Sequence, residues 1–295
     1  KPGGNPPGAD AADPASFYQP NDVIVYPNGD ILVAEGHGGA NSRLIRFDKT
    51  GKFLAQYGKA GVHRGAPNAQ GQPTFAGNSN DPQNFGRVAK IFVDPRENEA
   101  YIADGYLNKR VAVLDATTGV MKRYWGAYGN KPDDTNLGPY NPNAPPAQQF
   151  RNPVHCADLS TDNLLYVCDR ANDRIQVFQR DGKFVKEGFI AKQSLGEGSV
   201  WDIAFSRDPQ QTYIFLADGR NHKVRILRRD TLEELAAFGD GGRQPGLFYG
   251  VHSIAVDSKG NLYTTETYEG KRVQKFVYRG IGNVPRNQGA LWPRS

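Results

Sequence analysis

Short apolar runs that end in an acidic residue recur along the chain. Each run is followed by a polar turn that contains Asn or Gly and a base, and then by a second apolar run. The clearest copy is 165–178, where Leu-Tyr-Val-Cys-Asp leads through Arg-Ala-Asn-Asp-Arg to Ile-Gln-Val-Phe. Short apolar runs bounded by Gly, Asn and Asp predict β-strands, and no helical periodicity competes with them. Further copies begin at Leu32, Tyr101, Phe215 and Tyr263, so the same hairpin is predicted five times.

Each hairpin is the middle of a longer unit in which four strands are predicted. In the first unit, Asn28-Gly29 and Gly51-Lys52 supply the turns that tight antiparallel hairpins require. The first two strands of a unit are apolar at successive positions, which is typical of strands covered on both faces. The strands predicted for the first unit are 22–25, 31–34, 44–47 and 53–57.

Five copies of one four-stranded unit predict a repeat protein. Four-stranded units that repeat radially close into a β-propeller around a central channel, so we expect an all-β propeller over residues 21–279. A six-bladed ring with one blade missing from this sequence is favoured over an authentic five-bladed ring. The sixth blade would come from an upstream segment or from another chain. The five units cover approximately 22–57, 87–126, 153–187, 199–239 and 250–279.

The stretches between and outside the units are predicted to be irregular. Residues 58–86 and 127–150 are rich in Pro, Gly, Asn and Gln, and we expect long surface loops that serve as lids or contact arms. Residues 1–20 are interpreted as a Pro/Gly-rich linker or as the tail of a missing blade, because their sequence parallels the internal linker 59–85. Residues 280–295 are expected to form an irregular C-terminal tail.

Composition and charge narrow the function classes. The net charge is +5 and the pI is about 9.1, but the basic residues are spread through the repeats and are not interleaved with aromatic platforms. We therefore expect no nucleic-acid partner. No apolar run approaches the roughly 20 residues of a membrane helix, so no membrane span is expected. A secretory leader is not recognisable either. This absence is interpreted as a sign that the chain is mature, trimmed or cytosolic.

The two cysteines lie in one predicted hairpin. Pairing the strands about the turn 161–163 brings Cys156 and Cys168 nearly opposite each other, within one residue of register. A cross-strand disulfide is predicted if their Cα atoms lie within about 7 Å, although two buried thiols would look identical in sequence. The bridge favours an oxidising compartment, and we expect a secreted or periplasmic protein.

The units at 28–36, 169–178 and 181–184 resemble NHL repeats, and the resemblance covers about 20–279. The nearest enzymatic relatives that the sequence resembles are the bacterial branch of the peptidyl-α-hydroxyglycine α-amidating lyase family. The resemblance implies that a ligand binds at the mouth of the central channel, where the innermost strands and the loops after the second strands converge.

Two histidines occupy one repeat position of the innermost strand. Alignment of the repeats makes His155 and His252 equivalent, so both are expected to point toward the axis. Neutral imidazole is the commonest zinc ligand in proteins, and catalytic zinc sites typically have three protein ligands. The resemblance implies a third histidine, but Asn21 stands at the position where it is expected. The other members of this repeat position are Ala89 and Trp201.

These histidines predict a zinc ion in the channel. The alternative is that both imidazoles form hydrogen bonds in the channel wall and bind no metal. Calcium is disfavoured, because Ser253 stands where the family carries an acid that helps to hold that ion.

A second set of positions follows the second strand of each unit. The acid found there in every copy is interpreted as structural, because a carboxylate at a turn can accept backbone N–H groups or pair with the base further along. The residues beyond the acid vary, and Tyr106 and Arg170 match the tyrosine and arginine of the lyase family. The five acids are Glu35, Asp104, Asp169, Asp218 and Glu266.

The resemblance implies chemical roles for Tyr106 and Arg170. An arginine and a metal could lower the pKa of Tyr106 so that it accepts a proton, and Arg170 could bind a carboxylate in a bidentate fashion. The alternative is that both are ordinary surface residues at the channel mouth.

The favoured function is an extracytoplasmic binding or assembly module with a metal ion in its channel. Its partner would be another protein, or a small molecule or peptide bound at the channel mouth. The alternative is a zinc-dependent lyase that releases an amide and glyoxylate from a C-terminal hydroxyglycine, or a related small-substrate enzyme. Neither a phosphate-binding glycine loop nor a Ser-His-Asp motif is present to suggest another chemistry.

Overall fold

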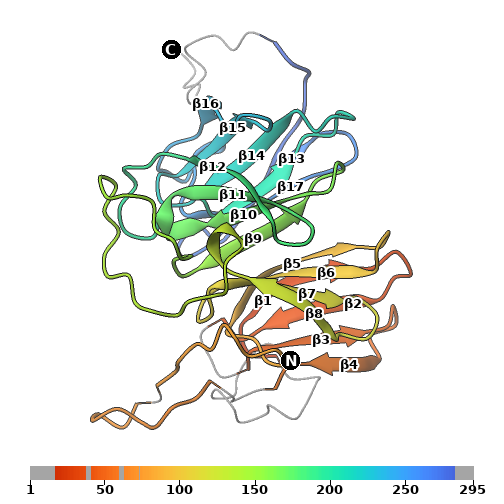
Figure 1. The fold of residues 1–295 in the computed structure, drawn as a ribbon. Coiled ribbons are helices and arrows are strands. Elements are labelled where there is room, and N and C mark those ends of the chain that lie inside the picture. The colour runs from red at the N-terminus through yellow and green to blue at the C-terminus, as the bar shows by residue number, and fades with distance from the viewer. Residues whose placement is uncertain (1–16, 38–40, 60–62, 73, 283–295) are drawn as a thin grey trace.

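The fold is a five-bladed β-propeller (Figure 1). The computed structural model describes residues 17–37, 41–59, 63–72 and 74–282. In Figure 1 the red-to-yellow sheets lie below and the green-to-blue sheets lie above, so the sheets follow one another in chain order. Blades 1 to 4 are antiparallel meanders of four strands, and blade 5 has three. The prediction of an all-β propeller built from four-stranded repeats is thus confirmed.

The strands follow one another along the chain, with the first strand of each blade innermost. Blade 1 contains β1 Pro20–Val25, β2 Ile31–Glu35, β3 Arg43–Phe47 and β4 Phe53–Tyr57, and blade 2 contains β5 Val88–Asp94, β6 Glu99–Asp104, β7 Arg110–Asp115 and β8 Met121–Trp125. Blade 3 contains β9 Val154–Leu159, β10 Leu164–Asp169, β11 Arg174–Gln179 and β12 Phe184–Phe189. Blade 4 contains β13 Asp202–Phe205, β14 Tyr213–Asp218, β15 Lys223–Arg228 and β16 Glu234–Phe238, and blade 5 contains β17 Val251–Val256, β18 Leu262–Glu266 and β19 Val273–Phe276.

Apolar layers between consecutive blades form the core. Four buried clusters fill the interfaces between consecutive blades from blade 1 to blade 5. This arrangement explains the continuous apolar strands, since β6 and β9 are buried along their whole length and β10 is buried beyond its first residue. In the described part of the chain, no such cluster joins blade 5 to blade 1. Val23 and Val25 on β1 are accordingly 59% and 63% exposed.

The innermost strands surround a central channel. Residues from β1, β5, β9, β13 and β17 all line one cavity of about 750 Å³. Equivalent positions of the repeats therefore converge on one axis, as the sequence predicted.

The acid at the end of each second strand is a structural anchor, which agrees with the sequence interpretation. In blade 2, Asp104 accepts the Gly86 N–H at 2.7 Å and the Arg110 Nε–H at 2.8 Å. The side chains of Asp104 and Arg110 are both fully buried. The Arg110 guanidinium then donates to the carbonyl of Asn84, in the segment that enters the blade. In blade 4 Lys223 takes the place of the arginine, and Arg225, two residues later on the same strand face, pairs with Asp218.

The predicted disulfide is present. Cys156 on β9 and Cys168 on β10 are directly opposite each other in the strand pairing, with their Cα atoms 4.8 Å apart. Such bridges are typical of proteins from oxidising compartments. Among the described residues, no helix is both long and apolar enough to cross a membrane.

The two long connections pack against each other. In the first, Ser79 donates its backbone N–H to Asp134 of the second at 2.8 Å, and the Asn80 amide donates to the Pro132 carbonyl at 3.1 Å. A short 3₁₀ turn, η1 Ala127–Gly129, begins the second connection. The loops therefore form one continuous surface beside blade 2.

Candidate functional site

The four residues singled out in the sequence lie together at one end of the channel. His155 lies near the start of β9 and His252 near the start of β17, and their ring centroids are 4.8 Å apart. Tyr106 follows β6, and its hydroxyl lies 2.8 Å from His155 Nε2. Arg170 follows β10 in the short turn η2 Arg170–Asn172, and its guanidinium carbon is 5.9 Å from the Tyr106 ring centroid. The repeat alignment thus identified residues that are neighbours in space.

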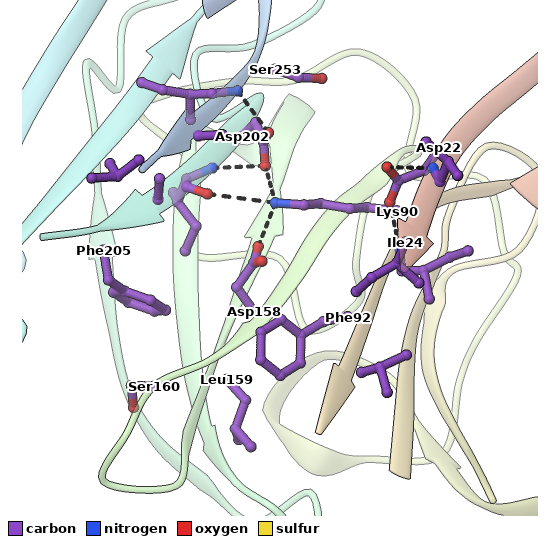
Figure 2. A pocket seen from close by; sticks show the side chains of 18 of the residues that line it. Asp22, Ile24, Lys90, Phe92, Asp158, Leu159, Ser160, Asp202, Phe205 and Ser253 are labelled. Atoms are coloured by element: carbon purple, nitrogen blue, oxygen red, sulfur yellow. Dashed lines mark hydrogen bonds and ion pairs between the residues drawn. The ribbon is translucent and has the colours of Figure 1, made fainter. Parts of the chain in front are cut away.

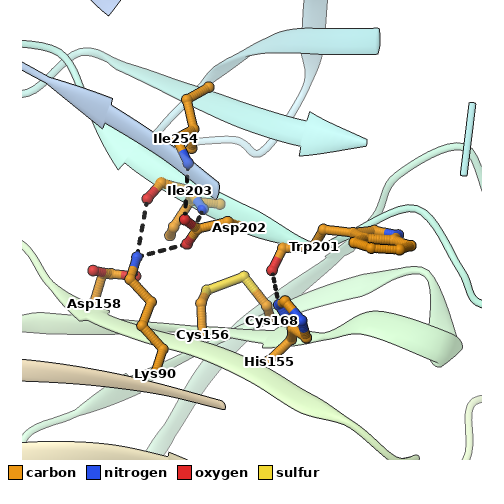
Figure 3. The surroundings of a disulfide bond; sticks show 9 residues. All are labelled: Lys90, His155, Cys156, Asp158, Cys168, Trp201, Asp202, Ile203 and Ile254. Carbon is orange, nitrogen blue, oxygen red and sulfur yellow. Dashed lines mark hydrogen bonds and ion pairs between the residues drawn. A yellow bond between two sulfur atoms is a disulfide. The ribbon is translucent and has the colours of Figure 1, made fainter. Parts of the chain in front are cut away.

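The tautomer of His155 follows from its two hydrogen bonds. Its Nδ1 lies 2.5 Å from the Trp201 carbonyl oxygen (Figure 3), and a carbonyl can only accept, so Nδ1 carries the proton. The lone pair of Nε2 therefore accepts the Tyr106 hydroxyl. Burial, together with His252 and Arg170, holds the pKa of His155 well below its usual range, so the ring is neutral.

His252 is a second neutral imidazole. Burial lowers its pKa to about 4, and Arg170 and His37 act in the same direction while Asp202 opposes them. Its Nδ1 lies 3.1 Å from the Ser253 hydroxyl. Trp201 fills the wall between the two histidines, with its ring 5.9 Å from that of His155 and 5.3 Å from that of His252.

His37 belongs to the site but was not chosen from the sequence. Its ring centroid is 4.0 Å from that of Tyr106, and burial, Arg170 and Arg87 lower its pKa. The signal was available, because His37 stands two residues after the acid of β2, as Tyr106 does after the acid of β6. Asn21 stands where the third histidine was expected, and its amide donates to the Val88 carbonyl and ties β1 to β5.

Tyr106 is protonated in the folded chain. Burial raises its pKa to about 12, and Arg170 opposes this rise without cancelling it. The sequence did not reveal how deeply the phenol is buried, and the lowered pKa expected beside both an arginine and a metal stays a prediction. In this state Tyr106 is a hydrogen-bond donor to His155.

Arg170 presents an unsatisfied donor to the mouth. Its side chain lies over Trp201, with the guanidinium carbon 4.4 Å from the ring centroid, and the residue is 9% exposed. Among the residues that the structure describes, the buried Nε–H has no hydrogen-bond partner. Leaving a buried donor unpaired costs about 1–3 kcal/mol, so an anionic ligand that accepts from Arg170 would recover this energy.

A second polar cluster lies deeper in the channel (Figure 2). The Lys90 ammonium donates to Asp158 at 2.8 Å and to Asp202 at 2.6 Å, and the three side chains are 19%, 12% and 5% exposed. Asp202 also accepts the Ile254 N–H at 3.0 Å, and Asp22 on β1 accepts the Ile91 N–H at 2.8 Å. These contacts tie the five innermost strands together across the axis.

The deep cluster does not fit a metal ion. Ligand atoms of Cys156, Asp158 and Asp202 do lie within 4.8 Å of one another. However, Cys156 is in the disulfide and offers no thiolate, and the Lys90 ammonium already bridges the two carboxylates (Figure 3). Lys90 thus supplies the positive charge that a cation would otherwise provide.

The imidazole pair fits a metal better. His155 and His252 are both neutral, as ligands must be, and the Trp201 carbonyl fixes the His155 ring through its other nitrogen. His37 is the third imidazole of this end of the channel, and Tyr106 contacts both His37 and His155, with ring centroids 4.0 Å and 5.6 Å away. The donor set of the mouth therefore consists of imidazoles, a phenol and a guanidinium.

Known proteins resemble this chain in sequence and in fold, although no protein-family model matches it. Peptidyl-glycine alpha-amidating monooxygenase B of Xenopus laevis is 30% identical over 184 residues, which is 62% of this chain and 19% of that protein. The probable peptidyl-alpha-hydroxyglycine alpha-amidating lyase of Caenorhabditis elegans is 46% identical over 48 residues, 16% of this chain and 13% of that protein. The chain therefore matches less than a fifth of the length of each of these two relatives.

Two further proteins extend the comparison over more of the chain. NHL repeat-containing protein 3 of Mus musculus is 26% identical over 221 residues, 70% of this chain and 54% of that protein. The crystal structure of virginiamycin B lyase from Staphylococcus aureus superposes with a TM-score of 0.50 and 12% identity, over 89% of this chain and 71% of the other. At that identity, the last likeness concerns the fold alone.

Proposed function

Because the chain is an NHL-repeat β-propeller, we propose that its channel mouth is the active site of a lyase of the amidating type. The substrate would be a peptide or small molecule that ends in an α-hydroxyglycine. The observation that carries the proposal is the junction of the Tyr106–His155 hydrogen bond, the unsatisfied Arg170 and the neutral His252. The name of the Caenorhabditis relative supports the same chemistry, and the name of the Xenopus relative supports a link to peptide amidation.

Arg170 is proposed to bind the substrate carboxylate. In the described part of the chain its buried Nε–H lacks an acceptor, and Trp201 holds its guanidinium in place at 4.4 Å from the ring centroid, so the fork of donors is positioned for an anion. A carboxylate bound there would bring the adjoining α-carbon toward Tyr106, whose ring is also within reach of the guanidinium.

His155 and His252 would hold a zinc ion, and His37 would be a candidate third ligand. When bound, the metal would supply a Lewis acid that lowers the pKa of a nearby hydroxyl. The Nε2 atom of His155 that accepts the Tyr106 hydroxyl is the atom that would face the metal. The Tyr106 phenol would then be released toward the substrate.

Tyr106 is proposed to take the proton in the reaction. The α-hydroxyl of the substrate gives its proton to the phenolate form of Tyr106, and the hydroxyl oxygen forms the carbonyl of glyoxylate. The bond between the α-carbon and the nitrogen breaks at the same time, and the proton is finally passed to the nitrogen of the released amide. Burial raises the pKa of Tyr106 to about 12 even with the cationic Arg170 beside it, so the phenolate would require the further positive charge that a metal held by His155 and His252 would supply.

The test is glyoxylate release from N-benzoyl-α-hydroxyglycine by the zinc-loaded protein. We expect glyoxylate and benzamide in equal amounts, and a loss of about 100-fold or more in turnover for Tyr106→Phe and Arg170→Met. Tyr140→Phe is the matched control, because that hydroxyl donates to the Lys192 carbonyl in the outer loop. Elemental analysis should find zinc that is lost in His155→Ala. Absence of glyoxylate release by protein that contains stoichiometric zinc would refute the lyase.

A binding or assembly module is the second candidate. The joined surface of the loops 58–86 and 127–150, beside a rigid ring, favours it. A protein that contains no zinc and releases no glyoxylate, but co-purifies with one partner through these loops, would support this function. For both candidates we propose a secreted or periplasmic location, on the basis of the Cys156–Cys168 disulfide.

A further inference from the structure

Blade 5 lacks the outer strand that the other four blades have. In the described residues, β19 pairs with β18 on one side and with no strand on the other. An unpaired strand edge is a template for another strand, because its backbone N–H and C=O groups are free to pair. The consequence is visible at Arg272, whose side chain is 25% exposed, whereas the equivalent Arg110 and Arg174 are fully buried.

The pattern of β19 matches that of β11 in blade 3. Both strands read Arg, β-branched residue, Gln, any residue, Phe, in Arg272–Phe276 and in Arg174–Phe178. Both strands also pair in the same register with the second strand of their blade. Gln274 is opposite Thr264, two residues before the acid Glu266, and Gln176 is opposite Val167, two residues before the acid Asp169. The strand that covers β11 is therefore a template for the strand that would cover β19.

The outer strands of the complete blades share one feature. Each covers the arginine of the third strand, in blades 1, 3 and 4 with a hydrogen-bond acceptor and in blade 2 with an aromatic ring. In blade 3, Glu187 on β12 is opposite Gln176 and accepts from both Gln176 and Arg174, at 3.0 Å and 3.2 Å. Gln56 on β4 and Glu234 on β16 accept from the arginines of blades 1 and 4, each at 2.8 Å, and the Tyr124 ring on β8 lies over Arg110.

The exposed edge of blade 5 is also cationic. Lys271, Lys275 and Arg279 are exposed on and beside β19, and Lys275 occupies the position of Val177 in β11. An incoming strand would therefore need a carboxylate opposite Lys275 as well as one opposite Gln274. The sequence at the spacing of the other outer strands, 282–287, contains Pro285 and no acid, so it does not have this pattern.

We propose that β19 is a docking edge for an extended acidic segment of another polypeptide, which adds antiparallel to blade 5 as its fourth strand. The segment would carry a carboxylate opposite Gln274, where it meets Arg272, and a second carboxylate opposite Lys275. Like charges directly opposite on paired strands destabilise the pair, so a basic segment, or a second copy of the basic β19 edge itself, would be rejected.

The probe is a labelled peptide that copies residues 183–190 with Lys186→Glu, that is, Lys-Phe-Val-Glu-Glu-Gly-Phe-Ile. Fluorescence anisotropy with the full chain should show saturable binding, and the peptide with both glutamates changed to lysine should bind about 10-fold more weakly or not at all. Lys275→Glu should reverse this preference, and Lys52→Glu, an exposed change in blade 1, should leave it unaltered. Hydrogen exchange should show new protection in β19 when the acidic peptide is bound.

Each other outcome would overturn the inference. No binding of the acidic peptide, or equal binding of the two peptides, would remove the charge argument. Binding that persists in Lys275→Glu would place the peptide elsewhere. A dimer, detected by sedimentation, that the peptide fails to dissociate and that protects β19 would assign the edge to a second copy of the chain.

Discussion

At the scale of single residues, the channel depends on how its buried charges are compensated. Lys90 neutralises Asp158 and Asp202, and its pKa is raised because the attraction of these carboxylates outweighs the effect of burial. Asp22 lies further from the ammonium and accepts backbone N–H groups instead. Burial therefore raises the pKa of Asp22 to about 6, so this carboxyl remains largely protonated in mildly acidic solution.

Asp22→Asn should change the pH dependence of stability. The folded chain holds a proton on Asp22 between its ordinary pKa of 3.8 and about 6, whereas the unfolded chain does not. Wild-type stability therefore falls as the pH rises through this window, by up to about 3 kcal/mol for this group. The uncharged asparagine lacks this dependence, and urea denaturation at pH 4, 5, 6 and 7 should show a smaller decline in the variant.

The control for this experiment is Asp257→Asn. Hydrogen bonds from the Asn261 side chain and backbone lower the pKa of Asp257 to about 2, so its contribution has the opposite sign and is lost as the pH falls. A decline that is identical in wild type and Asp22→Asn would show that Asp22 is not protonated in the folded chain.

At the scale of elements, each blade is fastened by an acid–arginine pair between its second and third strands. In blades 1, 2, 3 and 5 the acid also accepts a backbone N–H of the segment that leads into the blade, so one side chain fixes a hairpin and an incoming loop. In blades 1 to 3 both side chains are completely buried, but in blade 5 Arg272 remains partly exposed. The outer strand makes this difference, because it covers the guanidinium.

Arg110→Met should therefore destabilise the chain more than Arg272→Met. Removal of one partner from a buried ion pair leaves an uncompensated charge and costs about 3–5 kcal/mol, which is the expected loss for Arg110. A smaller loss is expected for Arg272, since solvent can reach its partner Glu266 once the side chain is removed. Chemical denaturation of both variants measures the two values, and equal losses would mean that exposure does not control the energy of these pairs.

At the scale of the whole molecule, the blades are not equivalent. Blades 2, 3 and 4 have an apolar interface on both faces, whereas blades 1 and 5 have one each in the described residues. Blade 3 also carries the disulfide between its first two strands. The stability of the chain should consequently decrease from the central blade toward both end blades.

Amide hydrogen exchange should reveal this gradient. We expect the slowest exchange in β9, which is fully buried, and in β10, which is buried beyond its first residue, and the fastest exchange among the strands in β1 and β19. The relevant measurement is mass-spectrometric exchange under native conditions, resolved by peptide. If β1 were as strongly protected as β9, the free face of blade 1 would have to be covered by another polypeptide.

The sequence by itself determined the repeat and the positions that share a role in it. Strand alternation and turn residues are local properties, so the hairpins, the structural acids and the Cys156–Cys168 pairing could be predicted. The alignment of repeats likewise brought out His155, His252, Tyr106 and Arg170, because equivalent positions of a propeller converge on one axis. His37 also stands at a position that converges on the axis, two residues after the acid of the second strand. It was not predicted, because the third histidine was expected on the innermost strand, where Asn21 stands.

Only the tertiary structure decided the properties that depend on burial and on neighbours from other blades. The pKa of Tyr106 rises because the phenol is enclosed, and no pattern in the sequence measures that enclosure. Lys90 meets Asp158 and Asp202 from two other blades, so the charge balance of the channel exists only once the ring has formed. The unpaired edge of β19 also became evident only from the structure. A strand can be recognised from its own residues, whereas its pairing partners are known only from the tertiary structure.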